Sequence, residues 1–407
     1  MTYVTGLLAV SLLIYLGSKL GNTAKLHTLY MYVRFFKLQY FLAGIILNFI
    51  LPANFLFLLD ELRVSGLILC TGAIGMFFGC GLEIRTHQEH KPRLLLSNLI
   101  EPVLMFPIMA VAATILAALS LPPASSGKNI LLIALFASFT MFKRQGILYH
   151  QPDSQHHPFM DKLLPLGNVL PVAAFAILGI TVFSPESYTV FNHTFSGWEA
   201  FLAMLLAIGL SCGMILNMLI AAAPDIRSMG VILAGGAALT SGLASTFSLS
   251  PLVVGTLTGS IVINSTLRRL QVLESLRSMH EIIEKIYMFL IGTLFYSIVL
   301  GMKSTIFSVV AGALILFACR SLVQYLFTRG FVKYTETDSL ETFTVWAGFT
   351  GQGILASAAL FEISYLSDVI MQMFICLLVL LLLNQAVIGI YMAVHEKGKI
   401  RREGSHA

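Results

Sequence analysis

Long apolar runs separated by short polar segments are the dominant pattern of this chain. A window of about 19 residues, closed at charges and at Gly- or Pro-rich breaks, separates thirteen such runs. The runs are apolar throughout and do not alternate with polar residues, so they predict transmembrane helices and not strands. The expected spans are 2–18, 36–52, 64–82, 94–118, 129–142, 163–183, 198–222, 229–247, 250–267, 283–301, 304–327, 343–361 and 366–394.

Composition excludes a soluble globule. Of the 407 residues, 57% are hydrophobic and 11% are charged, whereas an ordinary soluble domain has about 25% charged residues. Spans of about 20 residues leave room only for short loops and tails. We therefore expect one all-α polytopic membrane domain over 1–407, surrounded by the lipid bilayer. The net charge of +5 does not indicate nucleic-acid binding, because the basic residues lie between the apolar runs.

The basic residues also predict orientation. Arg63, Lys128 and Lys303 fall on one side of the predicted bundle, Arg320 lies inside a span, and the remaining Lys and Arg residues share the other side. The basic side is expected to face the cytoplasm. The N-terminus is then outside and the basic tail 395–407 is cytoplasmic, as in a multi-pass protein of the cell membrane, the inner membrane if the source is bacterial.

The number of spans indicates an inverted repeat. Thirteen spans divide into six, one and six, and a shift of seven spans reverses the direction of the chain in the membrane. We expect a first repeat over 2–183, a linker span over 198–222 and an inverted second repeat over 229–394.

Two spans at matched positions in the repeats look discontinuous. The span 129–142 is short and contains Ser138 and Thr140, and the span 343–361 contains a glycine-rich run with Gln352. Broken helices at matched positions are typical of the substrate site of a transporter. The alternative is that these glycines only allow close helix packing.

Few polar groups lie inside the spans, and each is a candidate functional residue because burial in lipid is costly. Arg320 is one, although a long side chain near a helix end can also reach the interface and act as an anchor. Glu101 is either a buried proton carrier or a hydrated interfacial residue. Asn168 combines a polar amide with a nearby helix breaker, Pro171.

Small residues inside the spans indicate packing. Gly75 with Gly79, and Gly255 with Gly259, form small-xxx-small pairs that allow helices to approach closely. The five cysteines lie in apolar runs without a CxxC pair, so they predict neither a disulfide framework nor a zinc site. We expect no metal and no cofactor.

Several segments, in order along the chain, resemble the monovalent cation/proton antiporter superfamily, particularly its bacterial sodium/proton and potassium/proton exchanger branch. They are FKLQYFLAGIILNFILP, GAIGMFFGCGLEIR, LSPLVVGTLTGSIVINS and GTLFYSIVLG. The resemblance implies a homodimer of antiporter fold, with crossed discontinuous fifth and twelfth spans. It also implies an ion- and proton-binding aspartate in the sixth span and a basic residue in the eleventh, where Arg320 stands.

The chain departs from this family at the sixth span. Asn168 stands at the expected position of the aspartate, and the sequence has no acidic residue between Asp161 and Glu186. An amide can ligate a cation but cannot exchange a proton at physiological pH. Proton coupling has therefore moved, with Glu101 as the candidate carrier, or sodium-style exchange has been abandoned.

Two functions follow as hypotheses. The first is an elevator-like antiporter that moves a monovalent cation against protons, with an ion site formed by Asn168, Arg320, Ser138, Thr140 and Gln352. The second is a proton-uncoupled or transport-silent homologue that acts as a membrane sensor or scaffold, or that carries an anion or a neutral solute. An enzyme is not expected, because no nucleophile, base and orienting acid occur together and no metal-ligand spacing is found.

Overall fold

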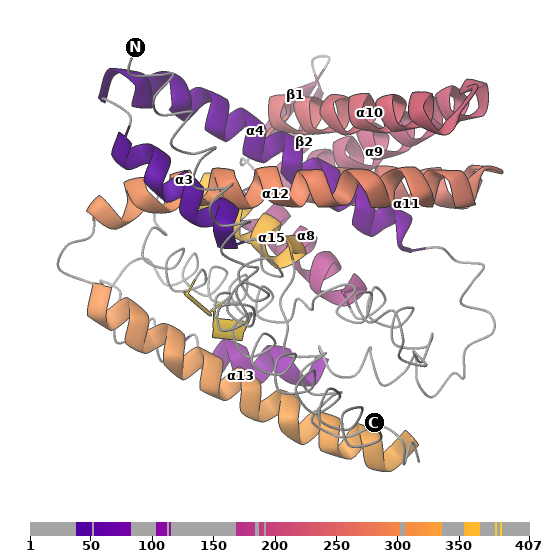
Figure 1. Ribbon diagram of the computed structural model, residues 1–407. Coiled ribbons are helices and arrows are strands. Elements are labelled where there is room, and N and C mark those ends of the chain that lie inside the picture. The colour runs from indigo at the N-terminus through magenta and orange to yellow at the C-terminus, as the bar shows by residue number, and fades with distance from the viewer. Residues whose placement is uncertain are drawn as a thin grey trace, which may run out of the picture.

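The computed structural model describes residues 38–50, 53–82, 103–111, 114, 168–183, 187–190, 193–301, 306–335, 354–366, 379–380 and 383–384. The predicted spans 2–18 and 129–142 lie outside these residues. Helices dominate the described part (Figure 1). The elements are α3 (Leu38–Ile50), α4 (Ala53–Cys80), α8 (Val169–Phe183), β1 (Ser187–Val190), β2 (His193–Ser196), α9 (Gly197–Ala222), α10 (Ile226–Thr246), α11 (Pro251–Ser265), α12 (Arg269–Gly301), α13 (Ile306–Thr335) and α15 (Ile354–Leu366).

The described helices agree with a multi-pass membrane protein. Among them, four contain stretches long and apolar enough to cross a membrane, and α11 is a shorter apolar helix. Each of these helices contains most of an expected span, although α4 and α13 extend beyond theirs. The four stretches are Arg63–Cys80, Gly197–Ala222, Ile226–Thr246 and Ala311–Arg329.

Helix α4 is longer than the sequence pattern predicted. It begins at Ala53, whereas the apolar run was expected to start at 64. Arg63, which we expected in a loop, therefore lies inside the helix, and its Nη1 donates to the Thr293 carbonyl of α12 at 3.4 Å. The charges that closed the apolar window did not end the helix, because charged residues such as Asp60 and Glu61 are compatible with helical backbone.

Helix α12 also starts earlier than expected, at Arg269 and not at 283. Val272 and Leu276 are buried, whereas Glu274 and Glu281 are exposed. Apolar residues four positions apart on one face, with charges on the other, make an amphipathic helix that continues beyond the apolar span. A window that averages hydropathy misses such an extension.

A short hairpin precedes α9. Strands β1 and β2 pair antiparallel, with Ser187 opposite Ser196 and Val190 opposite His193. Both strands contain β-branched or aromatic residues, which favour extended backbone. In the chain, the hairpin lies between α8 and α9. The described elements that are long and apolar enough to cross a membrane are helices, as expected.

Helices α4 and α11 pack through glycine, as the two small-xxx-small pairs predicted. A Cβ atom on Gly79 would lie 2.0 Å from the Thr256 carbonyl oxygen, and one on Gly75 would lie 2.2 Å from that of Leu252. On the opposing helix, a Cβ on Gly259 would lie 2.1 Å from the Met76 carbonyl oxygen. Backbone therefore faces backbone across this junction, which leaves no room for a larger side chain.

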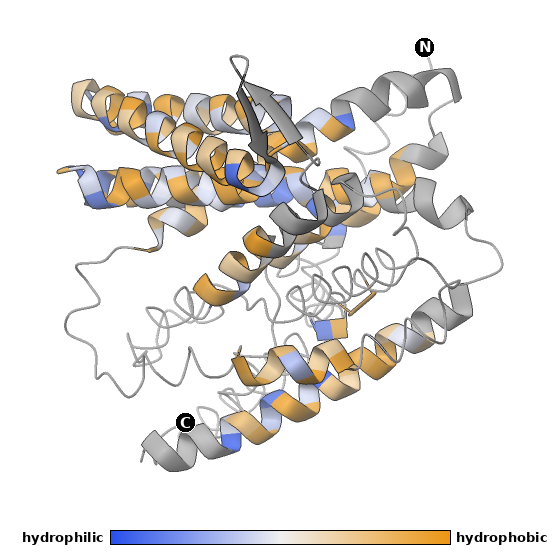
Figure 2. Ribbon diagram, turned by 180° about the vertical axis from the view of Figure 1, so that it is seen from behind, coloured by the Kyte–Doolittle hydropathy of each residue, from blue (hydrophilic) through white to orange (hydrophobic). Residues whose placement is uncertain are grey.

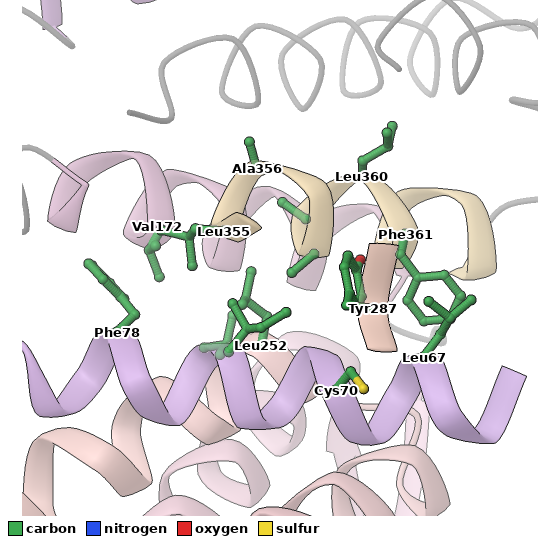
Figure 3. Packing of buried hydrophobic residues seen from close by; sticks show 14 of the residues in the cluster. Leu67, Cys70, Phe78, Val172, Leu252, Tyr287, Leu355, Ala356, Leu360 and Phe361 are labelled. Carbon is green, nitrogen blue, oxygen red and sulfur yellow. The ribbon is translucent and has the colours of Figure 1, made fainter. Parts of the chain in front are cut away.

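Helix α15 lies at the centre of the core. It packs against α4 and α11, and residues all round its circumference are buried, including Leu355, Ala356, Ala359 and Leu360. Figure 3 shows α15 above α4, with apolar side chains of both helices between them. In Figure 1, α13 lies on the opposite side of α15 from α10 and α4.

The outer surface of α9 is apolar. Its large exposed side chains recur four positions apart, and Figure 2 shows hydrophobic residues along most of α9 and α10, at the upper left of that view. Its opposite face is buried in the protein, so the helix is apolar on both faces, as expected for a surface in contact with lipid. The exposed residues are Trp198, Leu202, Leu206, Leu210, Met214, Ile215, Met218 and Leu219.

Candidate functional site

Asn168 lies at the first turn of α8. The residue is fully buried, with 0% exposure, and its backbone carbonyl accepts a hydrogen bond from the Val172 N–H at 3.0 Å. This is the bond that the residue preceding a helix makes with the first turn, and asparagine is favoured there. Pro171 falls in that same turn, where a missing N–H costs nothing. The amide is thus placed at a helix start inside the protein.

Arg320 lies on the buried face of α13. Its side chain is 0% exposed, so the alternative in which it reaches the surface as an anchor does not describe its position. The neighbours on this face, Leu316, Gln324 and Thr328, recur four positions apart and are also buried. Three polar residues, Arg320, Gln324 and Thr328, therefore line the buried side of one membrane helix. This is unusual, because loss of hydration opposes their burial. This face of α13 is therefore a candidate site.

The other predicted site residues lie outside the described residues. They are Ser138, Thr140 and Gln352 among the expected ligands, and Glu101 as the expected proton carrier.

The structure adds a residue that the sequence analysis missed, Glu362 of α15. Its side chain is 1% exposed, and both of its oxygens accept hydrogen bonds from the start of α11. The Ser250 hydroxyl donates to Oε2 at 2.5 Å, and the Leu252 N–H donates to Oε1 at 2.6 Å. Among the residues whose side chains the structure describes, Arg320 and Glu362 are the charged residues that are almost wholly buried.

The environment of Glu362 explains how a carboxylate is held there. Ser250 is the N-cap of α11, and its hydroxyl oxygen also accepts from the Val253 N–H at 3.1 Å. The N-terminus of a helix carries a partial positive charge and free N–H donors, both of which favour an anion. Among the described residues no cationic side chain pairs with Glu362, so the end of α11 takes the place of a counter-ion.

Glu362 was missed because the apolar window was closed at its charge. The predicted span ended at 361, which placed the glutamate at a water boundary. Two signals were available in the sequence. Apolar residues lie on both sides of it, in ALFEISYL, and the Ser250–Pro251 pair is a typical helix start that can receive a carboxylate.

A second polar contact joins α15 to the neighbouring helices. Tyr287 of α12 is fully buried, and its hydroxyl donates to the Ser357 carbonyl of α15 at 2.8 Å. Figure 3 shows the Tyr287 ring between α4 and α15, close to Phe361. Together with Glu362, this bond fixes α15 to α11 and α12 along an otherwise apolar contact.

No group of His, Cys, Asp and Glu residues that could hold a metal ion occurs among the described residues. Buried cysteines are dispersed there: Cys70 and Cys80 lie on α4, and Cys212 lies on α9. The described part of the site therefore offers polar groups on separate helices, which can contribute ligands for a small ion or solute.

Comparison with known proteins reveals a shared fold. No protein family model and no curated protein matches the sequence. Among solved structures, the chain is similar to the sodium proton antiporter MjNhaP1 from Methanocaldococcus jannaschii, with a TM-score of 0.60 and 13% sequence identity. The alignment covers 97% of this chain and 98% of that chain. The chain therefore has the fold of a sodium/proton antiporter over nearly its whole length.

Proposed function

We propose that the protein is a secondary transporter of the cation/proton antiporter type, which moves a monovalent cation against protons. The observation that supports this most directly is the complete burial of Asn168 and Arg320 in a chain that shares its fold with a sodium/proton antiporter over 97% of its length. A buried amide and a buried guanidinium are costly in a membrane protein, and such groups mark ion and solute pathways.

In this proposal the two inverted repeats, 2–183 and 229–394, enclose the site, and 198–222 links them. Spans 4 to 6 and 11 to 13, which include α8, α13 and α15, move as a group against the other spans. The protein is a homodimer with its N-terminus outside. Transport follows an elevator-like movement of this group across the membrane.

The ion site in this proposal consists of neutral oxygen ligands beside a fixed positive charge. Asn168, Ser138, Thr140 and Gln352 supply the oxygens, and Arg320 supplies the charge. Because the amide of Asn168 cannot exchange a proton, a different group has to carry it. Glu101 is the candidate from the sequence.

Proteoliposomes with a pH-sensitive dye inside test this proposal. The wild type should move protons when sodium or potassium is added outside. Asn168→Ala should reduce that flux by about 5- to 150-fold, since one good ligand contact contributes about 1–3 kcal/mol. Glu274→Gln, at an exposed position of α12, is the matched control and should leave the flux unchanged. Absence of cation-dependent proton movement in the wild type would contradict the proposal.

The alternative function is supported by the absence of an acid from the sixth span, since no acidic residue occurs between Asp161 and Glu186. A site with a fixed positive charge and no carboxylate also suits an anion or a neutral solute, or a silent sensor or scaffold. The same vesicles loaded with a panel of anions and neutral solutes separate these cases. Asn168→Asp should restore cation-dependent proton flux in a transporter and should produce none in a silent homologue.

A further inference from the structure

The hydrogen bonds of Glu362 join two parts of the molecule that the proposed function separates. Glu362 belongs to α15, which lies in the moving group, whereas Ser250 and Leu252 begin α11, which lies outside that group. The contact connects residues more than 100 positions apart in the chain. Movement of α15 past α11 has to break both hydrogen bonds.

The strength of this contact depends on the protonation state of the carboxyl group. A carboxylate accepts through both oxygens, and hydrogen bonds to a charged acceptor are about twice as strong as those between neutral groups. When one proton binds to one oxygen, the negative charge is cancelled and that oxygen becomes a donor. The protonated group keeps one good acceptor and loses its attraction to the positive end of α11.

Glu362 is the carboxylic acid among the titratable groups around this contact. Tyr287 of α12 lies near it, and Cys70 of α4 lies near Tyr287. A phenol and a thiol ordinarily lose their protons only in alkaline solution. The first turn of α11 presents a hydroxyl and backbone N–H groups, and α8 contains no titratable residue. The other buried charge, Arg320, is on α13, and a guanidinium stays protonated throughout.

We propose that Glu362 is a proton-binding site of the transport cycle. Deprotonated Glu362 holds α15 to the N-terminus of α11, and proton binding releases it so that the moving group can change position. The proton enters on one side and leaves on the other, which restores the carboxylate. This assignment rests on the proposed transport function, and it supplies the acid that Asn168 cannot provide. The bond from Tyr287 to Ser357 does not titrate, and it also has to break when α15 moves past α12.

Hydrogen–deuterium exchange of the purified protein in lipid nanodiscs tests the proposal without requiring transport. Exchange at the Leu252 N–H should rise about fivefold between about pH 8 and about pH 5, after correction for the intrinsic exchange rate, because a charged hydrogen bond becomes a neutral one. Glu362→Gln should abolish this pH dependence. The matched control Glu274→Gln should retain it.

A second variant keeps the test decisive if Glu362→Gln does not fold. Ser250→Ala removes one donor to the carboxylate, and the midpoint of the pH response should then move to higher pH because the charged form is less stabilised. A pH response that is absent from the wild type, or unchanged in both variants, overturns the proposal.

Flux measurements distinguish the two proposals from each other. If the exchange response depends on Glu362 but the vesicles show no cation-dependent proton movement, the proton site stands and the transport function fails. If vesicles exchange cations for protons and Glu362→Gln retains the wild-type pH profile of that flux, transport stands and Glu362 is only a structural contact to α11.

Discussion

The α4–α11 junction and the buried face of α13 are packed by opposite means. At the junction, glycines bring backbone against backbone, and a Cβ on Gly79 would lie 2.0 Å from a carbonyl oxygen. On α13, long polar side chains such as Arg320 and Gln324 fill the buried face. Close backbone contact leaves little freedom to slide, whereas polar groups in a membrane interior are retained for function. The junction therefore has the close packing of a fixed scaffold, whereas the buried face of α13 has the polar groups that the proposed ion site requires.

The largest expected effect is the loss of stability when the junction is forced apart. Gly79→Ala should destabilise the protein by more than about 3 kcal/mol, because the added methyl group meets backbone atoms that have no room to move. Gly242→Ala on α10 is the matched control, since nothing lies within 4 Å of a Cβ at that position. The control should be neutral or stabilising by up to about 1 kcal/mol.

Thermal denaturation in detergent, followed by size-exclusion chromatography, measures both glycine variants. If Gly79→Ala melts at the same temperature as Gly242→Ala, the junction is not rigid and its contrast with α13 disappears.

The next effect concerns the polar face of α13. Arg320→Met removes a buried charge and leaves its polar partners unsatisfied, which should cost about 3–5 kcal/mol of stability. Arg320→Lys keeps the charge but not the planar array of donors, so it should recover part of the stability. The melting temperatures of the two Arg320 variants, measured beside those of the glycine variants, test this expectation. If Arg320→Met is as stable as the wild type, this face is an ordinary packing surface.

Much of the fold could be predicted from hydrophobic runs alone. The limits of α9, α10 and α11 follow from continuous apolar stretches, and the glycine pairs predicted the α4–α11 packing. The antiporter fold was expected because several segments resemble that superfamily in the same order along the chain. The fold shared with a solved antiporter over 97% of the chain agrees with this expectation. These features are local, so short windows of sequence contain them.

The candidate site was less accessible to the same reasoning. Asn168 and Arg320 were candidates because each interrupts an apolar run, with a surface anchor left open as the alternative for Arg320. Glu362 was not, because its meaning depends on donors supplied by Ser250 and Leu252, which are distant in sequence. A hydropathy window treats a charge as the end of a span and has no means of finding a helix N-terminus that compensates it.

A smaller effect tests the contact between α12 and α15. Tyr287→Phe removes the hydroxyl that donates to the Ser357 carbonyl and should cost about 1 kcal/mol. This loss should be equal at acidic and neutral pH, unlike that of Glu362→Gln, because the bond involves no group that titrates in this range. Melting temperatures of Tyr287→Phe and Glu362→Gln, each measured at acidic and at neutral pH, test this difference. A pH-dependent effect of Tyr287→Phe would show that the two contacts are coupled.

The smallest effect is expected at the N-cap of α10, outside the membrane-spanning part of the helix. Asp225 is fully exposed, and hydrogen bonds from the Ser228 side chain and then from its backbone N–H, at 2.8 Å, hold the pKa of Asp225 below its usual 3.8. Because the folded-state pKa is lowered, the carboxylate stabilises the fold above the usual pKa, and this contribution is lost as the pH falls through the folded-state value. Asp225→Ala should therefore lower the melting temperature slightly at neutral pH and not at all in strong acid. Asp225→Asn, which keeps an acceptor for the Ser228 N–H, should remain close to the wild type at both. A large loss in Asp225→Ala would mean that this end of α10 belongs with the tightly packed scaffold and is not a solvated helix start.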